Sequence, residues 1–534
     1  MRLGSASFLV TSLSISATDP PFHLKMSTFR FTVHPSEAIL TEGDAKTVDK
    51  LSRIVDPGSG GEVSRALNLW DGLIHFFDPQ TQTLPTGLLP RVKHRLEKRG
   101  HTVQLDYDFD VPVIPPVHAD YLCGIEMREY QVEAVNECLT NYRGLLWIAT
   151  NGGKSAIISA VVGSVVRATG KTFIVIVPNK LLLHQTSKDI QGFLGPDVRV
   201  GMAGDGIRKL DCDILVGTYQ TLLSGMPDSK GKCDREINTF LKHSIGVLVD
   251  EVHHLAASGL ASLMRFCKKA TFKLGCSGTI DKHDRALGRR ADDKARAHLW
   301  TLESLTGPVL YHVDNEFLIQ NGHSARPSIY IINDRAAYGP QIVTPPLNPM
   351  QFNSGMLAYK TVFDRGVVQD KTFLKSICLL SSVLAAQGKP PFVFSHSVDH
   401  LKAIYGVARA MRLNVAIISG KDSSLKRKEV IRRFTEEDNL IVLASSILDE
   451  GFSVNGIRSL ILAGARKSAV EILQRIGRGL RKKDEDNTTM VFDFDPLHST
   501  LLHKQFKSRK ATYEQEGFDI KYLSDFSLIP QMTF

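Results

Sequence analysis

The sequence predicts an α/β fold with two parallel-sheet domains in tandem, preceded by a small α+β domain. From about residue 120 to 310, short apolar runs alternate with helical segments, and a second such series runs to about residue 500. This alternation is typical of parallel sheets flanked by helices. A proline-rich stretch, residues 111–116, separates both series from the N-terminal part and reads as a stiff linker. The chain therefore divides into one small unit and two larger ones.

Length and composition agree with this division. The chain has 534 residues, and at roughly 150 residues per domain it should hold about three domains. A hydrophobic content of 43% and a charged content of 23% describe a globular protein of ordinary composition. The net charge of +9 favours a polyanionic partner. The seven cysteines form no C-x-x-C pair, which predicts reduced thiols in the cytoplasm and argues against a zinc site.

The first 26 residues are difficult to place. Phe8, Leu9 and Val10 give them a faint likeness to a signal peptide, but serines and threonines interrupt the apolar core. Met26 stands just before the first clear strand, residues 29–33. We interpret residues 1–26 as a disordered leader, or as the product of a start codon placed before the true start at Met26. No stretch approaches the ~20 apolar residues that a membrane span requires.

The predicted domain boundaries follow from these patterns. They are a disordered leader (1–26), an N-terminal accessory domain (27–115), a first sheet domain (116–310), a connector (311–360), a second sheet domain (361–505) and a C-terminal tail (506–534). In the first sheet domain we expect strands at residues 144–149, 172–177, 213–217, 245–249 and 272–276. In the second we expect strands at residues 391–395, 414–419, 440–444, 459–463 and 489–494.

The N-terminal domain contains one strongly basic helix, predicted over residues 88–99. Leucines and a valine occupy one face of this helix, and basic side chains occupy the others. The basic residues are Arg91, Lys93, Arg95, Lys98 and Arg99. Two interpretations remain open at this point: contact with DNA phosphates, or an ordinary solvated face.

A loop of small residues connects the strand at 144–149 to the apolar helix that follows. The loop and the start of the helix consist of Thr150, Asn151, Gly152, Gly153, Lys154 and Ser155. Glycines let backbone N–H groups close around phosphate, and the helix N-terminus adds its positive end. Lys154 would reach the terminal phosphates of a nucleotide, and the Ser155 hydroxyl would hold Mg²⁺. Because Ile148 stands where the strict pattern has its first glycine, a plain strand–turn–helix junction remains the alternative.

An acidic pair follows the strand at 245–249. Asp250 and Glu251 lie at the carboxyl end of a buried strand, where α/β sheets place their ligands. Asp250 would hold Mg²⁺, directly or through water, and Glu251 would polarise the attacking water in phosphoryl transfer. The alternative is a helix N-cap with a glutamate that complements the helix dipole.

A third pattern lies in the second sheet domain. Gln474, Arg478 and Arg481 are spaced i, i+4 and i+7, so they share one face of a helix. Two guanidinium groups on one face suit a phosphate supplied by the other domain, where they would neutralise transition-state charge. A solvated basic helix is the alternative.

Taken together, these segments resemble the motifs of superfamily 2 helicases and translocases, in order, from about residue 120 to 500. Residues 150–155 and 250–253 resemble motifs I and II, and residues 474–481 resemble motif VI. The remaining resemblances are residues 128–131 to the Q motif, 178–185 to motif Ia, 216–222 to motif Ib, 277–279 to motif III, 392–397 to motif IV and 445–453 to motif V. Motif III has glycine in place of the central alanine. Within the superfamily the chain is most similar to the phage UvsW-like group, related to the XPB-like branch.

The resemblance implies two RecA-like domains with ATP and Mg²⁺ bound between them. Adenine recognition would involve Arg128 and Gln131, and Gly451 of motif V would lie near the nucleotide. Lys154, Asp250, Glu251, Gln474, Arg478 and Arg481 would be the catalytic set. Ser155 and Asp250 would be the metal ligands.

The expected function is that of an ATP-dependent DNA helicase or translocase that unwinds or branch-migrates duplex, forked or branched DNA in replication, recombination or repair. Recombination or replication proteins are candidate partners, and the expected location is the cytoplasm, or the host cytoplasm for a phage-encoded chain. Three alternatives remain: the motor subunit of a restriction-type system, an RNA helicase, and a binding module with an inactive ATPase. The presence of every catalytic residue disfavours the last, and motor motifs do not separate DNA from RNA.

Overall fold

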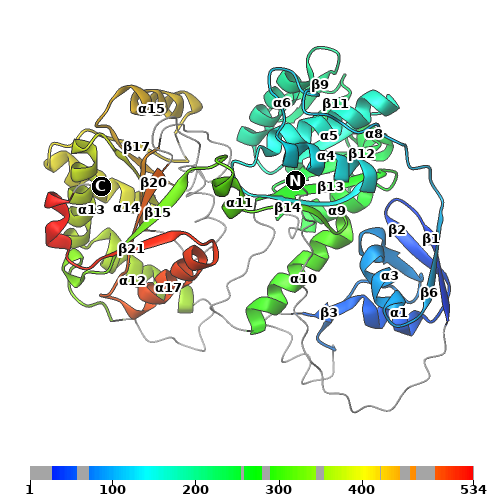
Figure 1. The fold of residues 1–534 in the computed structure, drawn as a ribbon, viewed down its shortest axis with the longest axis horizontal. Coiled ribbons are helices and arrows are strands. Elements are labelled where there is room, and N and C mark those ends of the chain that lie inside the picture. The colour runs from blue at the N-terminus through cyan, green and yellow to red at the C-terminus, as the bar shows by residue number, and fades with distance from the viewer. Residues whose placement is uncertain are drawn as a thin grey trace, which may run out of the picture.

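The fold consists of a small N-terminal domain and two domains built on parallel sheets (Figure 1). The computed structural model describes residues 27–56, 71–253, 258–278, 289–343, 354–420, 422–445, 457–464 and 488–532. No helix within these ranges is long and apolar enough to cross a membrane.

The N-terminal domain is a four-stranded sheet, in the order β5-β2-β1-β6, with helices packed on it. Its elements are β1 (Thr28–Val33), β2 (Glu37–Glu42), α1 (Ala45–Leu51), β3 (Arg53–Val55), β4 (Leu73–His75), β5 (Thr83–Pro85), α3 (Leu89–Glu97) and β6 (Thr102–Tyr107). Alternate residues of β1, Phe29, Phe31 and Val33, are buried against Val92 and Leu96 of α3. Period-two alternation in β1 and helical spacing in α3 therefore meet in one core, as the sequence predicts.

The first sheet domain holds eight strands in the order β10-β9-β11-β8-β12-β13-β7-β14, parallel except for β10. Its strands are β7 (Arg143–Ile148), β8 (Phe173–Val177), β9 (Val200–Gly204), β10 (Ile207–Lys209), β11 (Ile214–Thr218), β12 (Gly246–Asp250), β13 (Phe272–Ser277) and β14 (Val309–Val313). Its helices are α4 (Glu129–Asn141), α5 (Lys154–Thr169), α6 (Lys180–Leu194), α7 (Tyr219–Leu222), α8 (Arg235–His243), α9 (Ser258–Phe266) and α10 (Arg289–Leu305).

Both faces of this sheet are covered. Along β8, Phe173, Val175 and Val177 pack into the core shared with α4, α5 and α6. Ile174 and Ile176 point the other way, into the core shared with α7 to α10. Because successive strand residues face opposite sides and both sides are buried, the strand is apolar throughout.

The second sheet domain has seven parallel strands in the order β17-β18-β16-β19-β20-β15-β21. Its elements are β15 (Arg326–Ile332), α12 (Ser354–Phe363), α13 (Lys371–Ala386), β16 (Pro391–Ser395), α14 (Val398–Ala410), β17 (Val415–Ile418), α15 (Ser424–Glu436), β18 (Ile441–Ala444), β19 (Ser459–Gly464), β20 (Thr488–Phe494), α17 (Thr500–Gln515) and β21 (Asp519–Leu523). All ten strands expected from the sequence in the two sheet domains are present, with ends that differ by one residue at most.

The predicted connector and tail need correction. β14, at residues 309–313, pairs with β7 and belongs to the first sheet, while β15, at residues 326–332, lies between β20 and β21 in the second. The connection between the sheets is therefore residues 314–325, which contain α11 (Asn315–Gln320), and not residues 311–360. The predicted tail from residue 506 contains most of α17 and all of β21. These pairings join segments far apart in the chain, so no local pattern announces them.

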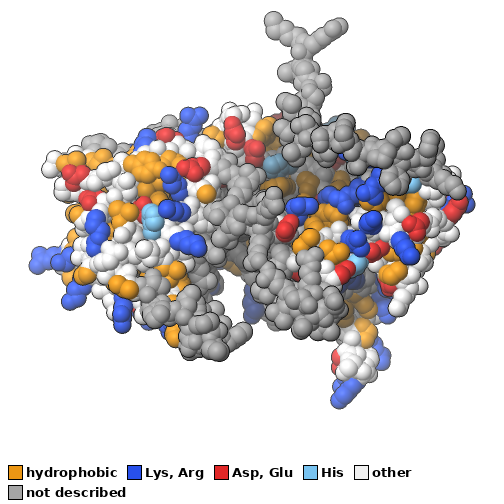
Figure 2. All heavy atoms as spheres, turned by 90° about the horizontal axis from the view of Figure 1, so that it is seen from below, with side chains coloured by type: hydrophobic (Ala, Val, Ile, Leu, Met, Phe, Trp, Pro, Cys, Tyr) orange, Lys and Arg blue, Asp and Glu red, His pale blue; other side chains and the backbone are white. Residues whose placement is uncertain are grey.

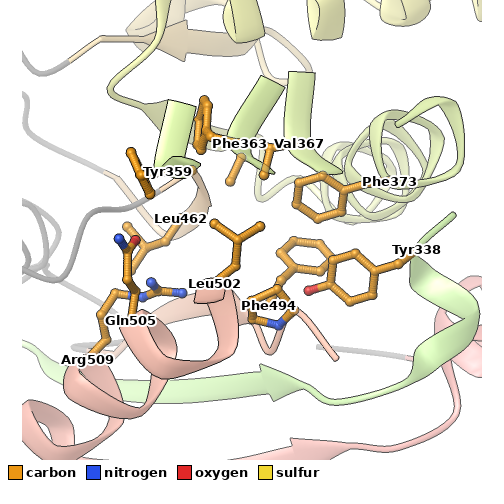
Figure 3. Close-up of a pocket in the computed structure, with 13 residues that line it drawn as sticks. Tyr338, Tyr359, Phe363, Val367, Phe373, Leu462, Phe494, Leu502, Gln505 and Arg509 are labelled. Atoms are coloured by element: carbon orange, nitrogen blue, oxygen red, sulfur yellow. The ribbon is translucent and has the colours of Figure 1, made fainter. Parts of the chain in front are cut away.

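A buried ion pair fixes α17 on the second sheet. Arg509 of α17 donates two hydrogen bonds of 2.8 Å to Asp493 of β20, and the Tyr513 hydroxyl donates a third of 2.8 Å. Both charges are almost fully buried, so the geometry must satisfy them closely. Figure 3 shows the hollow beside this contact, lined by aromatic side chains such as Tyr338 and Phe363. Its volume of about 30 Å³ has room for roughly one water molecule, so it is no nucleotide site.

The N-terminal domain is fastened to the first sheet domain through α3 and α10. Arg91 of α3 donates hydrogen bonds of 2.8 and 2.7 Å to Glu303 of α10. The guanidinium groups of Arg91 and Arg95 lie 5.1 and 4.7 Å from the ring centre of Trp300, also on α10. Arg95 further donates to the Leu51 carbonyl at 2.8 Å. Two of the five basic residues of this helix thus hold the domains together, while Lys98 and Arg99 remain exposed.

A second contact uses buried cations at the amino ends of two neighbouring strands. Lys273 of β13 donates to the Ser36 hydroxyl at 2.8 Å and to the Met264 carbonyl at 2.9 Å. Arg143 of β7 donates to the carbonyls of Pro35 and Thr306. Within the described residues neither cation has a carboxylate partner. Burial, with repulsion from Arg143, lowers the pKa of Lys273 to about 7.

Candidate functional site

The loop between β7 and α5, residues 149–153, has the sharp turns that the sequence predicts. Asn151 and Gly153 have φ angles of +72° and +76°. Asparagine is among the few residues that adopt this left-handed conformation readily, which explains how it replaces glycine at position 151. A Cβ on Gly153 would lie 2.1 Å from the Gln131 side chain, so only glycine fits there. α5 begins immediately afterwards, at Lys154.

Lys154 contacts Glu251 of the acidic pair, which follows a strand two positions away from β7 in the sheet. β12 ends at Asp250, and β13 lies between it and β7 in the sheet. Lys154 Nζ donates to Glu251 Oε1 at 3.0 Å. Burial opposes both charges, but their mutual attraction outweighs it, raising the pKa of Lys154 and lowering the pKa of Glu251. Two patterns almost 100 residues apart in the chain are therefore one site.

Asp250 and Glu251 are adjacent in the chain but differ in backbone conformation and in hydrogen bonding. Asp250 is 8% exposed, and its Oδ1 accepts a 2.9 Å hydrogen bond from the Glu251 N–H. Glu251 has a φ of +51°, a conformation uncommon for a residue with a side chain and frequent at functional sites. The two carboxylates thus make different contacts, and their roles in metal binding and water orientation stay predictions.

Motif III completes this edge of the sheet. The Ser277 hydroxyl, at the end of β13, donates to Glu251 Oε2 at 3.2 Å and lies 2.8 Å from His253 Nδ1. A Cβ on Gly278 would lie 3.3 Å from the Ile148 carbonyl and 3.5 Å from Lys154 Nζ. Glycine in place of the usual alanine therefore relieves a tight contact with the loop. Thr279 lies outside the described residues.

The Q motif lies against the same loop. The Arg128 N–H donates to Gln131 Oε1 at 2.9 Å, and Gln131 Nε2 donates to the Gly152 carbonyl at 3.1 Å. Gln131 thus caps the N-terminus of α4 and also holds the loop between β7 and α5. Sequence reasoning missed Tyr130, whose hydroxyl donates to the Gly152 carbonyl at 2.9 Å and accepts from Arg128 at 2.8 Å. An aromatic residue inside the motif, one position before Gln131, was the available signal.

Motifs Ia and Ib lie at the start of α6 and at the end of β11. Lys180 and His184 of motif Ia lie 2.8 and 3.1 Å from the carboxylate of Asp205, which sequence reasoning also missed. Asp205 is at the tip of the β9–β10 turn, with a φ of +53°. A Cβ on the preceding Gly204 would lie 2.9 Å from Leu183 and 3.0 Å from Thr218. The turn is therefore packed between the two motifs, and its Gly-Asp-Gly sequence was the only signal.

Several predicted site residues lie outside the described residues: Gly451, Gln474, Arg478 and Arg481. β19 and β20, which lead into and out of the segment with the two arginines, are described and are neighbours in the second sheet. For these four residues the sequence prediction stands as a prediction.

Comparisons with known proteins agree with this geometry. The family described as "Type III restriction enzyme, res subunit" matches residues 124–282, and "Helicase conserved C-terminal domain" matches residues 373–483. The chain is 23% identical over 472 residues to "ATP-dependent DNA helicase uvsW" of Enterobacteria phage T4, covering 85% of this chain and 86% of that one. It is 22% identical over 390 residues to "DNA 3'-5' translocase XPB2" of Sulfurisphaera tokodaii, covering 68% and 80%.

A solved structure supports the fold. Saccharomyces cerevisiae Dbp5 bound to RNA and ADP BeF3 matches with a TM-score of 0.50 and 14% identity, covering 76% of this chain and 94% of that one. The two sheet domains thus have the tandem RecA-like arrangement. With the joined motifs I, II and III, the two helicase domains in chain order and the relatives that span most of its length, the chain belongs to the superfamily 2 helicases, near the UvsW and XPB branch.

Proposed function

We propose that this chain is an ATP-dependent DNA helicase or translocase that unwinds or branch-migrates duplex and branched DNA. The contact between Lys154 and Glu251, 3.0 Å long, carries the proposal. It places a phosphate-binding lysine and a candidate water-orienting carboxylate at one edge of one sheet. Two relatives that span 85% and 68% of the chain are described as a DNA helicase and a DNA translocase. Replication, recombination or repair is the proposed setting, in the cytoplasm.

The residues of the first sheet domain supply the binding steps. Loop N–H groups and the N-terminus of α5 attract the phosphates of ATP. Lys154, now paired with Glu251, transfers its hydrogen bond to a terminal phosphate oxygen, and this frees the Glu251 carboxylate to accept a proton from the attacking water. Gln131 and Arg128, held at the start of α4, are positioned for adenine. Arg478 and Arg481 would complete the site from the second domain.

The oxygen donors present suit Mg²⁺. Asp250 presents a largely buried carboxylate beside the loop, and Ser155 follows Lys154 at the start of α5. Carboxylate and hydroxyl oxygens, together with substrate phosphates, are the ligands that Mg²⁺ prefers. Asp250 and Ser155 would hold the ion, which supplies charge neutralisation on the phosphates.

Nucleic acid would contact the surface formed by motifs Ia and Ib. Lys180 is 72% exposed, and the ends of α6 and β11 beside it offer backbone N–H groups. Contacts of this kind bind phosphates without reading bases. On the face drawn in Figure 2, lysine and arginine side chains are spread over both halves of the molecule, with acidic side chains among them. The overall charge of +9 adds a general attraction to DNA.

The alternatives receive less support. The restriction-enzyme description matches only residues 124–282, whereas the DNA helicase relative spans most of the chain. RNA helicases match about 20% of the chain, so RNA as the substrate is retained only as an outcome of the test.

The function is tested by measuring ATP hydrolysis with single-stranded, duplex and forked DNA and with RNA. We expect the largest stimulation with forked or duplex DNA, and none in a folded Lys154→Ala variant, which lacks the charge that pairs with the terminal phosphates. Stronger stimulation by RNA would favour an RNA helicase. Wild-type turnover by Lys154→Ala would overturn the assignment of the site.

A further inference from the structure

One short helix connects the two sheet domains. α11 lies in the twelve residues between β14 and β15, and Figure 1 shows it between the two sheets. Its Leu318 is fully buried in the core of the first sheet domain. The next residue, Ile319, packs against a core of the second domain. Adjacent residues of one helical turn thus contact different domains, so α11 cannot shift on one domain without shifting on the other.

The same helix contacts the phosphate-loop machinery. Phe317 packs edge-on against Tyr130, with ring centres 5.5 Å apart at 85°. Tyr130 is 4% exposed, and its hydroxyl donates the 2.9 Å hydrogen bond to the Gly152 carbonyl. A Cβ at Gly152 would lie 3.8 Å from a Leu318 methyl group. The loop, Tyr130 and α11 therefore form one continuous set of packed groups.

A hydrogen bond attaches the start of α11 to the C-terminal part of the second domain. Asn315 Nδ2 donates to Glu516 Oε2 at 2.7 Å, directly after α17. Burial raises the pKa of Glu516. Phe317, by contrast, is 40% exposed, so its contact with Tyr130 can change without opening a core. The two contacts therefore differ: the hydrogen bond of Asn315 is partly buried, whereas Phe317 lies at the surface.

We infer that Tyr130 and α11 link the state of the phosphate loop to the position of the second domain, with Tyr130 as a positioning residue for ATP hydrolysis. The inference rests on the proposed function, because it concerns closure of the same ATP site. Phosphates in the loop require its N–H groups, and any rotation of those peptides moves the Gly152 carbonyl. The Tyr130 hydroxyl moves with that carbonyl, and Phe317 moves with the Tyr130 ring. α11 then moves the second domain toward the site. A coupling of this kind is worth roughly 5–150-fold in an equilibrium constant.

The variant that isolates the link is Tyr130→Phe, because it removes one hydroxyl and keeps the ring that packs on Phe317. In DNA-saturated assays we expect kcat to fall about tenfold while the KM for ATP stays within about twofold. Labels on the two sheet domains, read by energy transfer with a non-hydrolysable ATP analogue, should report less closure. Phe317→Ala, at a residue outside the loop, should give the same pattern. The combined variant should lose little more than either one alone, as coupled groups do.

The matched control is Tyr142→Phe, at the opposite end of α4. This variant should leave both kcat and closure unchanged. A raised KM for ATP with normal closure in Tyr130→Phe would make the hydroxyl a support for the loop only and overturn the inference. Additive losses in the combined variant would overturn it as well. Failure of the proposed function itself differs, because the wild-type protein would then show no DNA-stimulated hydrolysis.

Discussion

Lys154 Nζ lies 3.0 Å from Glu251 Oε1, so the lysine proposed to bind phosphate is held by the carboxylate proposed to orient water. In the proposed complex, ATP and Glu251 would therefore compete for the same cation. Each charge is stabilised by the other: the pKa of Glu251 is lowered and the pKa of Lys154 is raised. This arrangement keeps both groups charged.

Glu251→Gln should separate nucleotide binding from chemistry. The neutral amide releases Lys154 and removes a negative charge near the phosphates, so ATP affinity should be retained or increased. Hydrolysis should fall by roughly 10²–10⁴-fold, because the group that accepts the water proton is lost. Nucleotide binding by fluorescence and single-turnover hydrolysis measure the two effects. An equal loss of affinity would instead make Glu251 a metal ligand or a structural group.

Arg478→Ala and Arg481→Ala test the contribution of the second domain. Each should lower kcat by roughly 10³-fold if it neutralises transition-state charge, with a smaller change in ATP affinity. Lys482→Ala, in the same predicted helix but off the predicted face, is the control and should have little effect. Equal, small effects from all three variants would support the solvated basic helix.

Asp205→Asn should tighten nucleic-acid binding. The carboxylate now occupies Lys180 and His184, and its loss frees both for phosphate. The freed Lys180 ammonium group, on meeting a phosphate, should steepen the log–log salt dependence of duplex DNA binding by about 0.9. The control is Asp211→Asn, whose carboxylate pairs with Arg199 at 2.6 Å at the other end of β9. DNA binding measured across a salt series tests this prediction. An unchanged slope for Asp205→Asn would show that DNA does not bind beside Lys180 and His184.

Substitutions in the basic segment of the N-terminal domain should have different effects at its paired residue and at its exposed residues. Arg91→Ala leaves the buried Glu303 carboxylate without its partner and should destabilise the protein by about 1.5–3 kcal/mol. The pair Lys98→Ala and Arg99→Ala should leave stability unchanged and flatten the salt dependence of forked-DNA binding. Denaturation curves and binding titrations separate the two effects. A normal salt slope in the second variant would show that this helix does not touch DNA.

Lys273 makes the domain interface sensitive to pH. Its pKa is lowered by burial from the ordinary 10.5 to about 7, so between these values the unfolded chain binds more protons than the folded one. Stability must therefore rise with pH across that window, and the cost of the buried charge is complete below pH 7. The difference in unfolding free energy between wild type and Lys273→Met should increase by at most about 1.4 kcal/mol per pH unit. Parallel pH curves would contradict a buried charged lysine.

The sequence by itself determined the α/β class with two parallel sheets in tandem, ten strands of these sheets and the residues of the phosphate loop. These features have local signals: apolar runs of strand length, a glycine-rich turn before a helix, and carboxylates just after a strand. It also determined that Lys154 and the pair Asp250 and Glu251 belong to one site, because carboxyl ends of parallel strands share one edge of a sheet.

Only the tertiary structure decided which distant side chains contact each other. Arg91 on α3 and Lys98 just after its end have the same charge, but only Arg91 lies opposite Glu303, more than 200 positions away in the chain. Likewise β15 becomes an interior strand only when β20 and β21 pair with it from both sides. Tyr130 and Asp205 contact residues that are distant in the chain and that only the folded structure brings beside them. Periodicity records which face of an element is buried, whereas the partner on that face depends on how distant segments come together.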